Sequence, residues 1–371
     1  MTHAVATQHA ATAPRERGWR WFVLAIIAAL LATAASRWPP ALALLAAVVR
    51  LALPVEQLVV LALVPLGACA LVGWWSGGRS SVAVVAVLLV GWLVLKAPLP
   101  ATDYGTFVRG WSLALGAAFG LVCLASSNRP FLGRALASVA LAAAVAAVGA
   151  GSQSARSGSF AGPVHVLETD YQRRLDESLS AWKGRTESGG WQAFSARLPL
   201  VAARAERVSE QLEVLAGSAD LRSTSTMVLL SPALLALESL LALALGWASY
   251  HRLARTRIGP PLAAIRDLRF NDQLVWGLVV GAILVALPNL SSFRVAGLNL
   301  LCFFGALYAL RGAGVLSWWI PDRAALALLL LLVVLVFVLG PVLVLTTLVA
   351  VCFGVGLSDT WRDFRAPARA R

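Results

Sequence analysis

Apolar positions follow one another in long unbroken runs through most of the chain, and one polar stretch at 151–226 interrupts them. A helix that crosses a bilayer needs about 20 mostly apolar residues, whereas the strands of a membrane barrel alternate apolar and polar positions. The run at 324–339 is apolar throughout and shows no alternation. The pattern therefore predicts an all-α fold, a polytopic transmembrane helical bundle.

The apolar runs predict ten membrane spans, five before the polar stretch and five after it. They lie at 21–35, 55–75, 82–95, 110–126, 131–148, 227–250, 274–290, 295–320, 324–339 and 341–357. A further run at 39–53 is bounded by prolines and carries Arg50. Because it is short for a span, we expect it to form a re-entrant or interfacial helix.

Within the polar stretch, apolar residues recur at helical spacing in two sets, one on either side of a glycine-containing turn at 184–190. The first set is Val164, Leu167, Tyr171, Leu175, Leu179 and Trp182, and the second is Leu198, Val201, Ala205, Val208, Leu212 and Leu215. This pattern predicts an antiparallel helical hairpin. Its apolar seam would pack on itself or on the bundle, or would form a docking surface for another subunit.

These elements divide the chain into five regions. They are a cytoplasmic N-terminal tail at 1–18, a first transmembrane half at 19–150, the extracytoplasmic hairpin insert at 151–226, a second transmembrane half at 227–357 and a basic cytoplasmic tail at 358–371.

The distribution of charge predicts the direction of threading. Hydrophobic residues make up 59% of the chain and charged residues 13%, with a formal net charge of +13. The insert holds nine basic and nine acidic residues, so the whole excess lies in the tails and in or between the spans. Cytoplasmic loops of membrane proteins carry such an excess, and no nucleic-acid partner is needed to explain it. We therefore expect a bacterial inner-membrane protein with both termini in the cytoplasm. The basic residues expected at the cytoplasmic face are Arg15, Arg17, Arg20, Arg79, Arg129, Arg134, Arg252, Arg255, Arg257, Arg266, Arg269, Arg323, Arg362, Arg365, Arg369 and Arg371.

Two ionisable residues lie inside predicted spans, where charge is costly and usually functional. Glu238 is surrounded by leucine and alanine, and Arg311 lies well inside the span at 295–320. An ion pair between them is feasible, and Asn299 is a further polar group in the same half. A structural pair, a polar ligand site or proton-coupled pathway, and snorkelling to the interface remain open.

No pattern for catalysis or for a cofactor is visible. The acidic residues Glu168, Asp170, Asp176 and Glu177 are expected on a solvated helical face, and there is no phosphate-binding glycine loop. The four cysteines lie singly in apolar runs, without metal-ligand or disulfide spacing. Tryptophans near span ends, Trp111 among them, are expected to anchor the protein at the membrane interface. We therefore expect no enzyme, no metal and no cofactor.

Three stretches of the second half carry a family resemblance. The first is the connector and following helix, from Arg257-Ile-Gly-Pro-Pro-Leu through Phe270-Asn-Asp-Gln-Leu-Val-Trp276. The second is Leu307-Tyr-Ala-Leu-Arg-Gly312, together with Asn299-Leu-Leu before it, and the third is the terminal Gly356-Leu-Ser-Asp-Thr-Trp-Arg-Asp-Phe-Arg365. With them, the chain resembles the YybS-like family of predicted bacterial membrane proteins, which is distantly similar to the S components of energy-coupling-factor vitamin transporters. The resemblance implies a ligand pocket between spans and a cytoplasmic coupling partner. The residues that carry it include Phe270, Trp276, Asp359, Trp361, Asp363 and Arg365. The terminal motif would lie at the cytoplasmic interface as one amphipathic turn, or would fold back onto the connector at 252–269.

Two functions follow as hypotheses. The first is a transporter-like or small-molecule-binding bundle with Glu238, Asn299 and Arg311 near the ligand. The alternative is a non-catalytic membrane scaffold or assembly factor that acts through the hairpin or the cytoplasmic tail. The lipid bilayer is the expected partner in both, with a small-molecule ligand in the first and a membrane or cytoplasmic protein in the second.

Overall fold

The computed structural model describes residues 53–55, 58–75, 79–97, 102–126, 129–157, 162–200, 226–253, 259–320 and 341–362, with isolated positions between and after these ranges. Every regular element in this part of the chain is a helix, and no strand is present there. The all-α prediction is confirmed for these residues. The predicted segments at 1–18 and 21–35, nearly all of 39–53, most of 324–339, and residues Asp363 and Arg365 lie outside the described part.

Four of the described helices are long and apolar enough to cross a membrane. They are α5 (Asp103–Ala125), α6 (Phe131–Ser157), α12 (Ser231–Leu253) and α14 (Arg294–Trp319). Shorter apolar helices accompany them: α3 (Leu58–Trp75), α4 (Ser80–Lys96), α13 (Val275–Ala286) and α16 (Pro341–Ser358). Each of these helices falls on one of the predicted spans. The total of ten spans stays a prediction.

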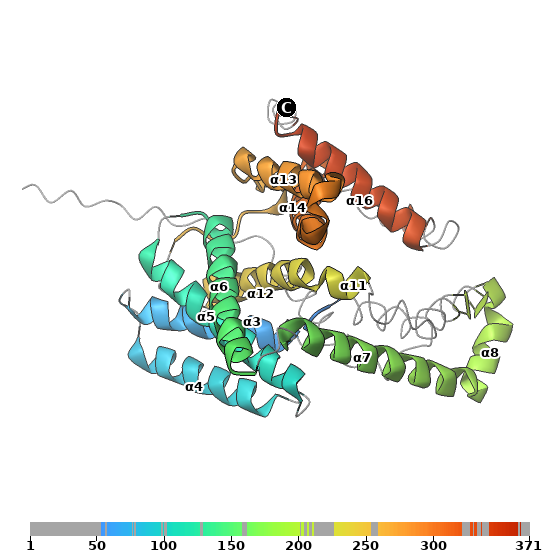
Figure 1. The fold of residues 1–371 in the computed structure, drawn as a ribbon, viewed down its shortest axis with the longest axis horizontal. Helices are drawn as coiled ribbons and strands as arrows, with labels where there is room; N and C mark the ends of the chain where they lie inside the picture. The colour runs from blue at the N-terminus through green and yellow to red at the C-terminus, as the bar shows by residue number, and fades with distance from the viewer. Residues whose placement is uncertain are drawn as a thin grey trace, which may run out of the picture.

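Helices α3, α4, α5, α6 and α12 form the larger of two helical groups, in the lower part of Figure 1. Its core includes Leu61, Leu115, Leu243 and Trp247, all almost completely buried. Val55, which precedes α3, binds Glu238 in the first half of α12, and Gly73 near the end of α3 lies against Tyr250 near the end of α12. The two helices therefore run in the same direction. A helix from the predicted second half is thus part of the core of the first.

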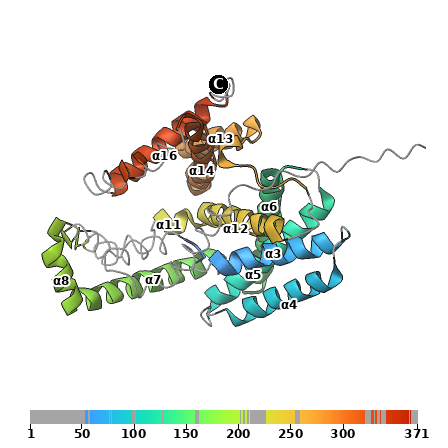
Figure 2. The same cartoon turned by 180° about the vertical axis from the view of Figure 1, so that it is seen from behind.

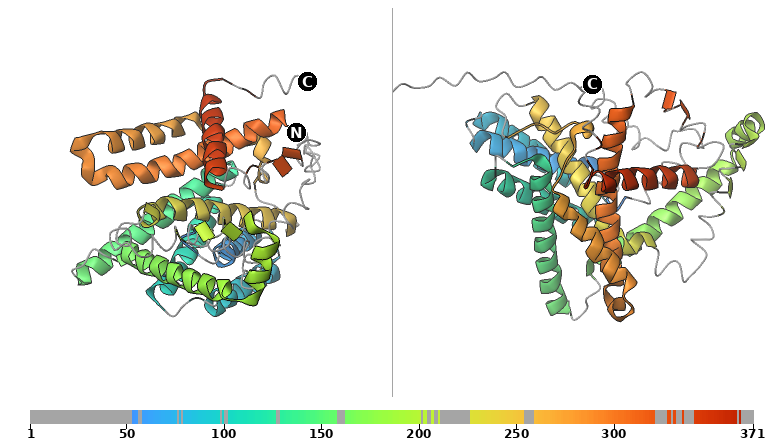
Figure 3. Two further views of the ribbon diagram at one scale, coloured as in Figure 1. Left: turned by 90° about the vertical axis from the view of Figure 1, so that its right-hand side faces the viewer. Right: turned by 90° about the horizontal axis from the view of Figure 1, so that it is seen from above.

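The second group consists of α13, α14 and α16, which lie above α12 in Figure 1. A 3₁₀ turn, η4 (Pro288–Phe293), joins α13 to α14. Helix α16 crosses α14 steeply, as the left panel of Figure 3 shows. A Cβ atom at Gly312 would overlap the carbonyl of Cys352, so the two backbones approach each other directly at this crossing.

Helices α7 (Gly162–Thr186) and α8 (Gly189–Arg197) extend away from both groups, as Figures 1 and 2 show from opposite sides. The seam predicted for the first hairpin helix is present, since Leu167, Leu175, Leu179 and Trp182 are all buried. The turn in the structure is shorter than the predicted one at 184–190, because α7 continues to Thr186 and α8 already begins at Gly189. The second hairpin helix lies almost wholly outside the described residues, so the hairpin itself stays a prediction.

Three short elements complete the described chain. They are α11 (Thr226–Leu229) before α12, and the 3₁₀ turns η2 (Ile265–Asp267) and η3 (Asp272–Leu274) in the connector that leads to α13.

Candidate functional site

Glu238 lies inside the larger helical group and is only 3% exposed. It is about 10 Å along α12 from the start of that helix. Its Oε2 accepts a hydrogen bond from the backbone N–H of Val55 at 2.9 Å. The second oxygen, Oε1, is also buried and has no hydrogen-bond partner among the described residues. Within the described part of the chain, the carboxylate therefore has unused acceptor capacity.

The backbone beside Val55 is held by two further side chains. The Tyr104 hydroxyl of α5 donates to the carbonyl of Pro54 at 3.0 Å, and Nη1 of Arg174 in α7 donates to the carbonyl of Leu53 at 2.6 Å. Residues 53–55 are not helical, so their polar backbone groups need partners from outside the segment. Three helices thus supply one side chain each to the same non-helical segment. We call Glu238, Tyr104, Arg174 and its partner Asp170, with residues 53–55, the Glu238 cluster.

The arginine of this cluster is balanced by an acid on its own helix. Arg174 Nε lies 2.8 Å from Oδ2 of Asp170, and both side chains are almost fully buried. Asp170 also accepts from Arg173 at 2.6 Å. Burial opposes the charge of Arg173, but its hydrogen bonds to Asp170 and Glu177 outweigh that effect and raise the pKa of its guanidinium.

The prediction that Asp170 lies on a solvated face is wrong, because this residue is 3% exposed. Asp176 and Glu177 are exposed as expected. The burial of Asp170 could have been predicted from its spacing. Leu167, Asp170 and Arg174 follow one another at intervals of three and four, so they share the buried stripe of α7. Sequence reasoning read the apolar members of this stripe and missed the charged pair.

A second buried group of charges surrounds Arg311 of α14. Its Nε lies 2.9 Å from Oδ2 of Asp359, and its Nη1 lies 2.7 Å from Oδ1 of Asp272. Its Nη2 donates to the carbonyl of Asp359 at 3.0 Å, and the guanidinium lies 5.3 Å from the ring centre of Phe270. We call these four residues the Arg311 cluster. Arg311 and Asp359 are buried, whereas the side chain of Asp272 is 58% exposed.

The ion pair considered between Glu238 and Arg311 is not formed, because each residue binds other partners. Asn299 belongs to neither cluster. Its Oδ1 accepts from the N–H of Ala233 at 2.9 Å, and its Nδ2 donates to the carbonyls of Leu229 and Val295. Asn299 and Arg311 are also about 18 Å apart along α14. Asn299 and Arg311 are therefore too far apart along α14 to bind the same part of a small ligand.

The stretches that carry the family resemblance meet in the Arg311 cluster. Phe270, Arg311 and Asp359 come from the first, second and third of them, respectively. Trp276 and Trp361 are exposed, as expected for residues at a membrane interface. Asp359 pairs with Arg311 of α14 rather than lying in a free amphipathic turn.

One expectation about the first half is wrong. Trp111 does not anchor at the interface: it is 7% exposed and its Nε1 donates to Ser239 Oγ at 3.0 Å. The packing of Arg134 was also not expected: it is fully buried, 4.3 Å from the ring centre of Trp247, while the side of the membrane on which it lies stays a prediction. Its Nε and one terminal nitrogen have no hydrogen-bond partner among the described residues.

The apolar helices define a multi-pass membrane protein. Residues 201–355 match the family model described as "Predicted membrane protein (DUF2232)". This match covers less than half of the chain and includes α12, α13, α14 and most of α16. No curated protein and no solved structure matches the chain. Within the described residues, no group of three or more His, Cys, Asp or Glu side chains is arranged to hold a metal ion.

Proposed function

We propose that this protein is a transporter-like, small-molecule-binding helical bundle without enzymatic activity, and that the Glu238 cluster is its ligand site. The observation that supports this most is the buried Oε1 of Glu238, which lies beside the non-helical residues 53–55 and has no hydrogen-bond partner in the described part of the chain. Buried polar atoms are nearly always hydrogen-bonded, so an exception calls for a missing partner. The partner proposed here is a hydrogen-bond donor on a small molecule.

The surroundings of Glu238 support a binding site rather than a simple helix contact. Non-helical backbone beside a helix is typical of substrate sites in secondary transporters. Here the non-helical residues 53–55 precede α3, and side chains from α5, α7 and α12 converge on them. The resemblance to S components, in which a small molecule lies between spans, points to the same class of function.

The Arg311 cluster has a different role in this proposal. Its buried guanidinium is already bound by two carboxylates and one backbone carbonyl. A ligand would have to displace one of these contacts. We therefore assign this cluster to the packing of α14 against α16 and the connector.

Mild-detergent purification followed by mass spectrometry of bound small molecules tests the proposal. The variant Glu238→Gln retains an acceptor for the N–H of Val55 but has no carboxylate. Asp272→Asn is the matched control, because it removes an exposed carboxylate from the other cluster. We expect a small molecule to accompany the wild type and Asp272→Asn and to be lost from folded Glu238→Gln. Equal retention by Glu238→Gln, or wild-type protein from its native membrane with no bound molecule, would contradict the proposal.

One observation favours the alternative of a scaffold or assembly factor. Helices α7 and α8, which we call the arm, carry a small aromatic cluster in which the rings of Trp182 and Trp191 lie 5.0 Å apart. Leu198 and Leu200 follow with 48% and 86% exposure. If a protein partner binds here, Leu200→Ser will weaken its chemical cross-linking to the arm, whereas Glu238→Gln will not. A change in small-molecule binding without any change in cross-linking would favour the first proposal.

A further inference from the structure

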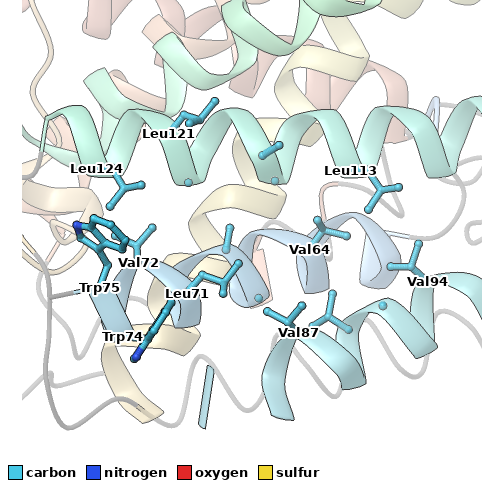
Figure 4. Close-up of a pocket in the computed structure, with 17 residues that line it drawn as sticks. Val64, Leu71, Val72, Trp74, Trp75, Val87, Val94, Leu113, Leu121 and Leu124 are labelled. Atoms are coloured by element: carbon cyan, nitrogen blue, oxygen red, sulfur yellow. The ribbon is translucent and has the colours of Figure 1, made fainter. Parts of the chain in front are cut away.

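An apolar groove runs between α3, α4 and α5 (Figure 4). It has a volume of about 570 Å³, and every residue that lines it is valine, leucine, alanine, glycine or tryptophan. Glycines contribute to the hollow: a Cβ atom at Gly91 would meet nothing within 4 Å, and one at Gly120 only the Cβ of Ala68. Apart from the indole N–H groups of Trp74 and Trp75 at one end, a polar ligand would find no hydrogen-bonding side chain along these walls.

The length of the groove corresponds to one leaflet of a bilayer. It extends along α3 from Val64 to Trp75 and along α5 from Leu113 to Leu124, about 16 Å of helix axis in each case. The hydrocarbon core of a membrane is about 30 Å thick, so one leaflet contributes about 15 Å. Helix α5 is long and apolar enough to cross a membrane, and α3 is one of the shorter apolar helices.

One end of the groove carries residues that are typical of the membrane–water interface. Trp74, Trp75 and Leu124 lie together at this end, opposite Val64, Val94 and Leu113 (Figure 4). The two tryptophans are 45% and 75% exposed, and tryptophan is enriched at the level of lipid headgroups.

Two exposed arginines follow directly after the helices that form this end. Arg79 precedes α4 in the loop after Trp75, and Arg129 lies in the loop after α5. Basic residues at this position attract anionic headgroups. The charge pattern of the whole chain predicts that both arginines face the cytoplasm.

We propose that this groove binds one acyl chain of an anionic phospholipid from the cytoplasmic leaflet. The chain lies along α3 between α4 and α5, and the headgroup phosphate lies beyond the tryptophans, near Arg79 and Arg129. A concave site surrounds the acyl chain on several sides, so it offers more carbon contacts than the outer face of a single helix. This lipid site is independent of the ligand site proposed at Glu238.

Photolabelling with a lipid probe tests the proposal. The full-length protein is placed in vesicles of phosphatidylethanolamine and phosphatidylglycerol that contain phosphatidylglycerol with a diazirine on one acyl chain. Adducts are located by mass spectrometry. We expect adducts on groove residues in the wild type and their loss in Gly91→Trp, whose indole would fill the groove. The control is Gly133→Trp, at an exposed glycine of α6 outside the groove with open space around it, which should label like the wild type.

A second variant leaves the groove unchanged and tests the headgroup. Arg79→Gln should lower the preference for phosphatidylglycerol over phosphatidylethanolamine in the groove about fivefold, the effect of one basic residue near an anionic surface. The proposal is overturned if adducts occur only on the exposed outer face of α4, or if Gly91→Trp labels as strongly as the wild type. It is also overturned if the groove of the wild type carries no lipid adduct.

Discussion

At the scale of single residues, two buried arginines differ in how their charge is balanced. Arg311 is bound by the carboxylates of Asp359 and Asp272. Arg134 has no carboxylate partner among the described residues and rests on the ring of Trp247. A cation–π contact is worth about 2 kcal/mol when desolvated, whereas burying an unpaired charge costs several kcal/mol. With the described partners alone, we expect Arg134 to weaken the fold and Arg311 to stabilise it by neutralising Asp359.

This difference predicts opposite effects for the same substitution. Arg311→Met leaves Asp359 buried without its partner and should lower the free energy of unfolding by about 3–5 kcal/mol. Arg134→Met removes an unpaired charge while keeping an apolar side chain on Trp247, so stability should stay unchanged or rise by about 1 kcal/mol. Equilibrium unfolding in detergent micelles measures both. A loss in Arg134→Met as large as in Arg311→Met would show that an anion outside the described residues neutralises Arg134.

The burial of Glu238 and Arg311 could be predicted from sequence, because an ionisable residue in the middle of an apolar run avoids lipid by facing the interior of the protein. Their partners could not. The partner of Glu238 is the backbone of Val55, which is distant in the sequence and exposes its N–H only because the chain is not helical there. Hydropathy also could not distinguish Trp111, which binds Ser239 in the core, from tryptophans that face the membrane surface.

At the scale of elements, the crossing of α14 and α16 depends on glycines at the contact. A Cβ atom at Gly356 would overlap the carbonyl of Tyr308, while one at Gly354, on the same helix, would meet nothing within 4 Å. The close approach brings the end of α16 within reach of α14, where Asp359 binds Arg311. Packing at the crossing and the buried ion pair thus stabilise the same arrangement.

Alanine substitutions at these two glycines should therefore differ. Gly356→Ala forces the backbones apart and should lower the free energy of unfolding by about 1–3 kcal/mol. Gly354→Ala only improves helix propensity, so it should leave stability unchanged or raise it by up to about 1 kcal/mol. Thermal unfolding of the two variants in the same detergent compares them directly. Equal stability of both would mean that α14 and α16 do not meet at Gly356.

Helix positions were predictable where hydropathy changes sharply. The predicted span at 82–95 corresponds to α4 (Ser80–Lys96), and the one at 295–320 to α14 (Arg294–Trp319). Helix α5 begins at Asp103, before the apolar run at 110–126, because its first turns are stabilised by packing of Tyr104 and Val108 rather than by lipid. Contacts between elements distant in the sequence, such as α3 with α12, leave no local pattern.

At the scale of the whole molecule, the two charged clusters are expected at opposite faces of the membrane. The charge bias assigns the start of α3 and the insert to the outer side, and their residues meet in the Glu238 cluster. It assigns the connector and the end of α16 to the cytoplasm, and their residues meet in the Arg311 cluster. The structure thus joins helix ends that the charge pattern independently places on the same side.

Cysteine labelling in intact cells tests this two-sided arrangement most directly. Ala181→Cys and Ala264→Cys, at exposed positions of α7 and the connector, are introduced singly into a chain whose four native cysteines are replaced by serine. A maleimide that does not cross membranes should label position 181 in intact cells, and position 264 only after the cells are permeabilised. Labelling of both positions from the outside, or of position 264 alone, would contradict the placement of the Glu238 cluster outside and the Arg311 cluster inside.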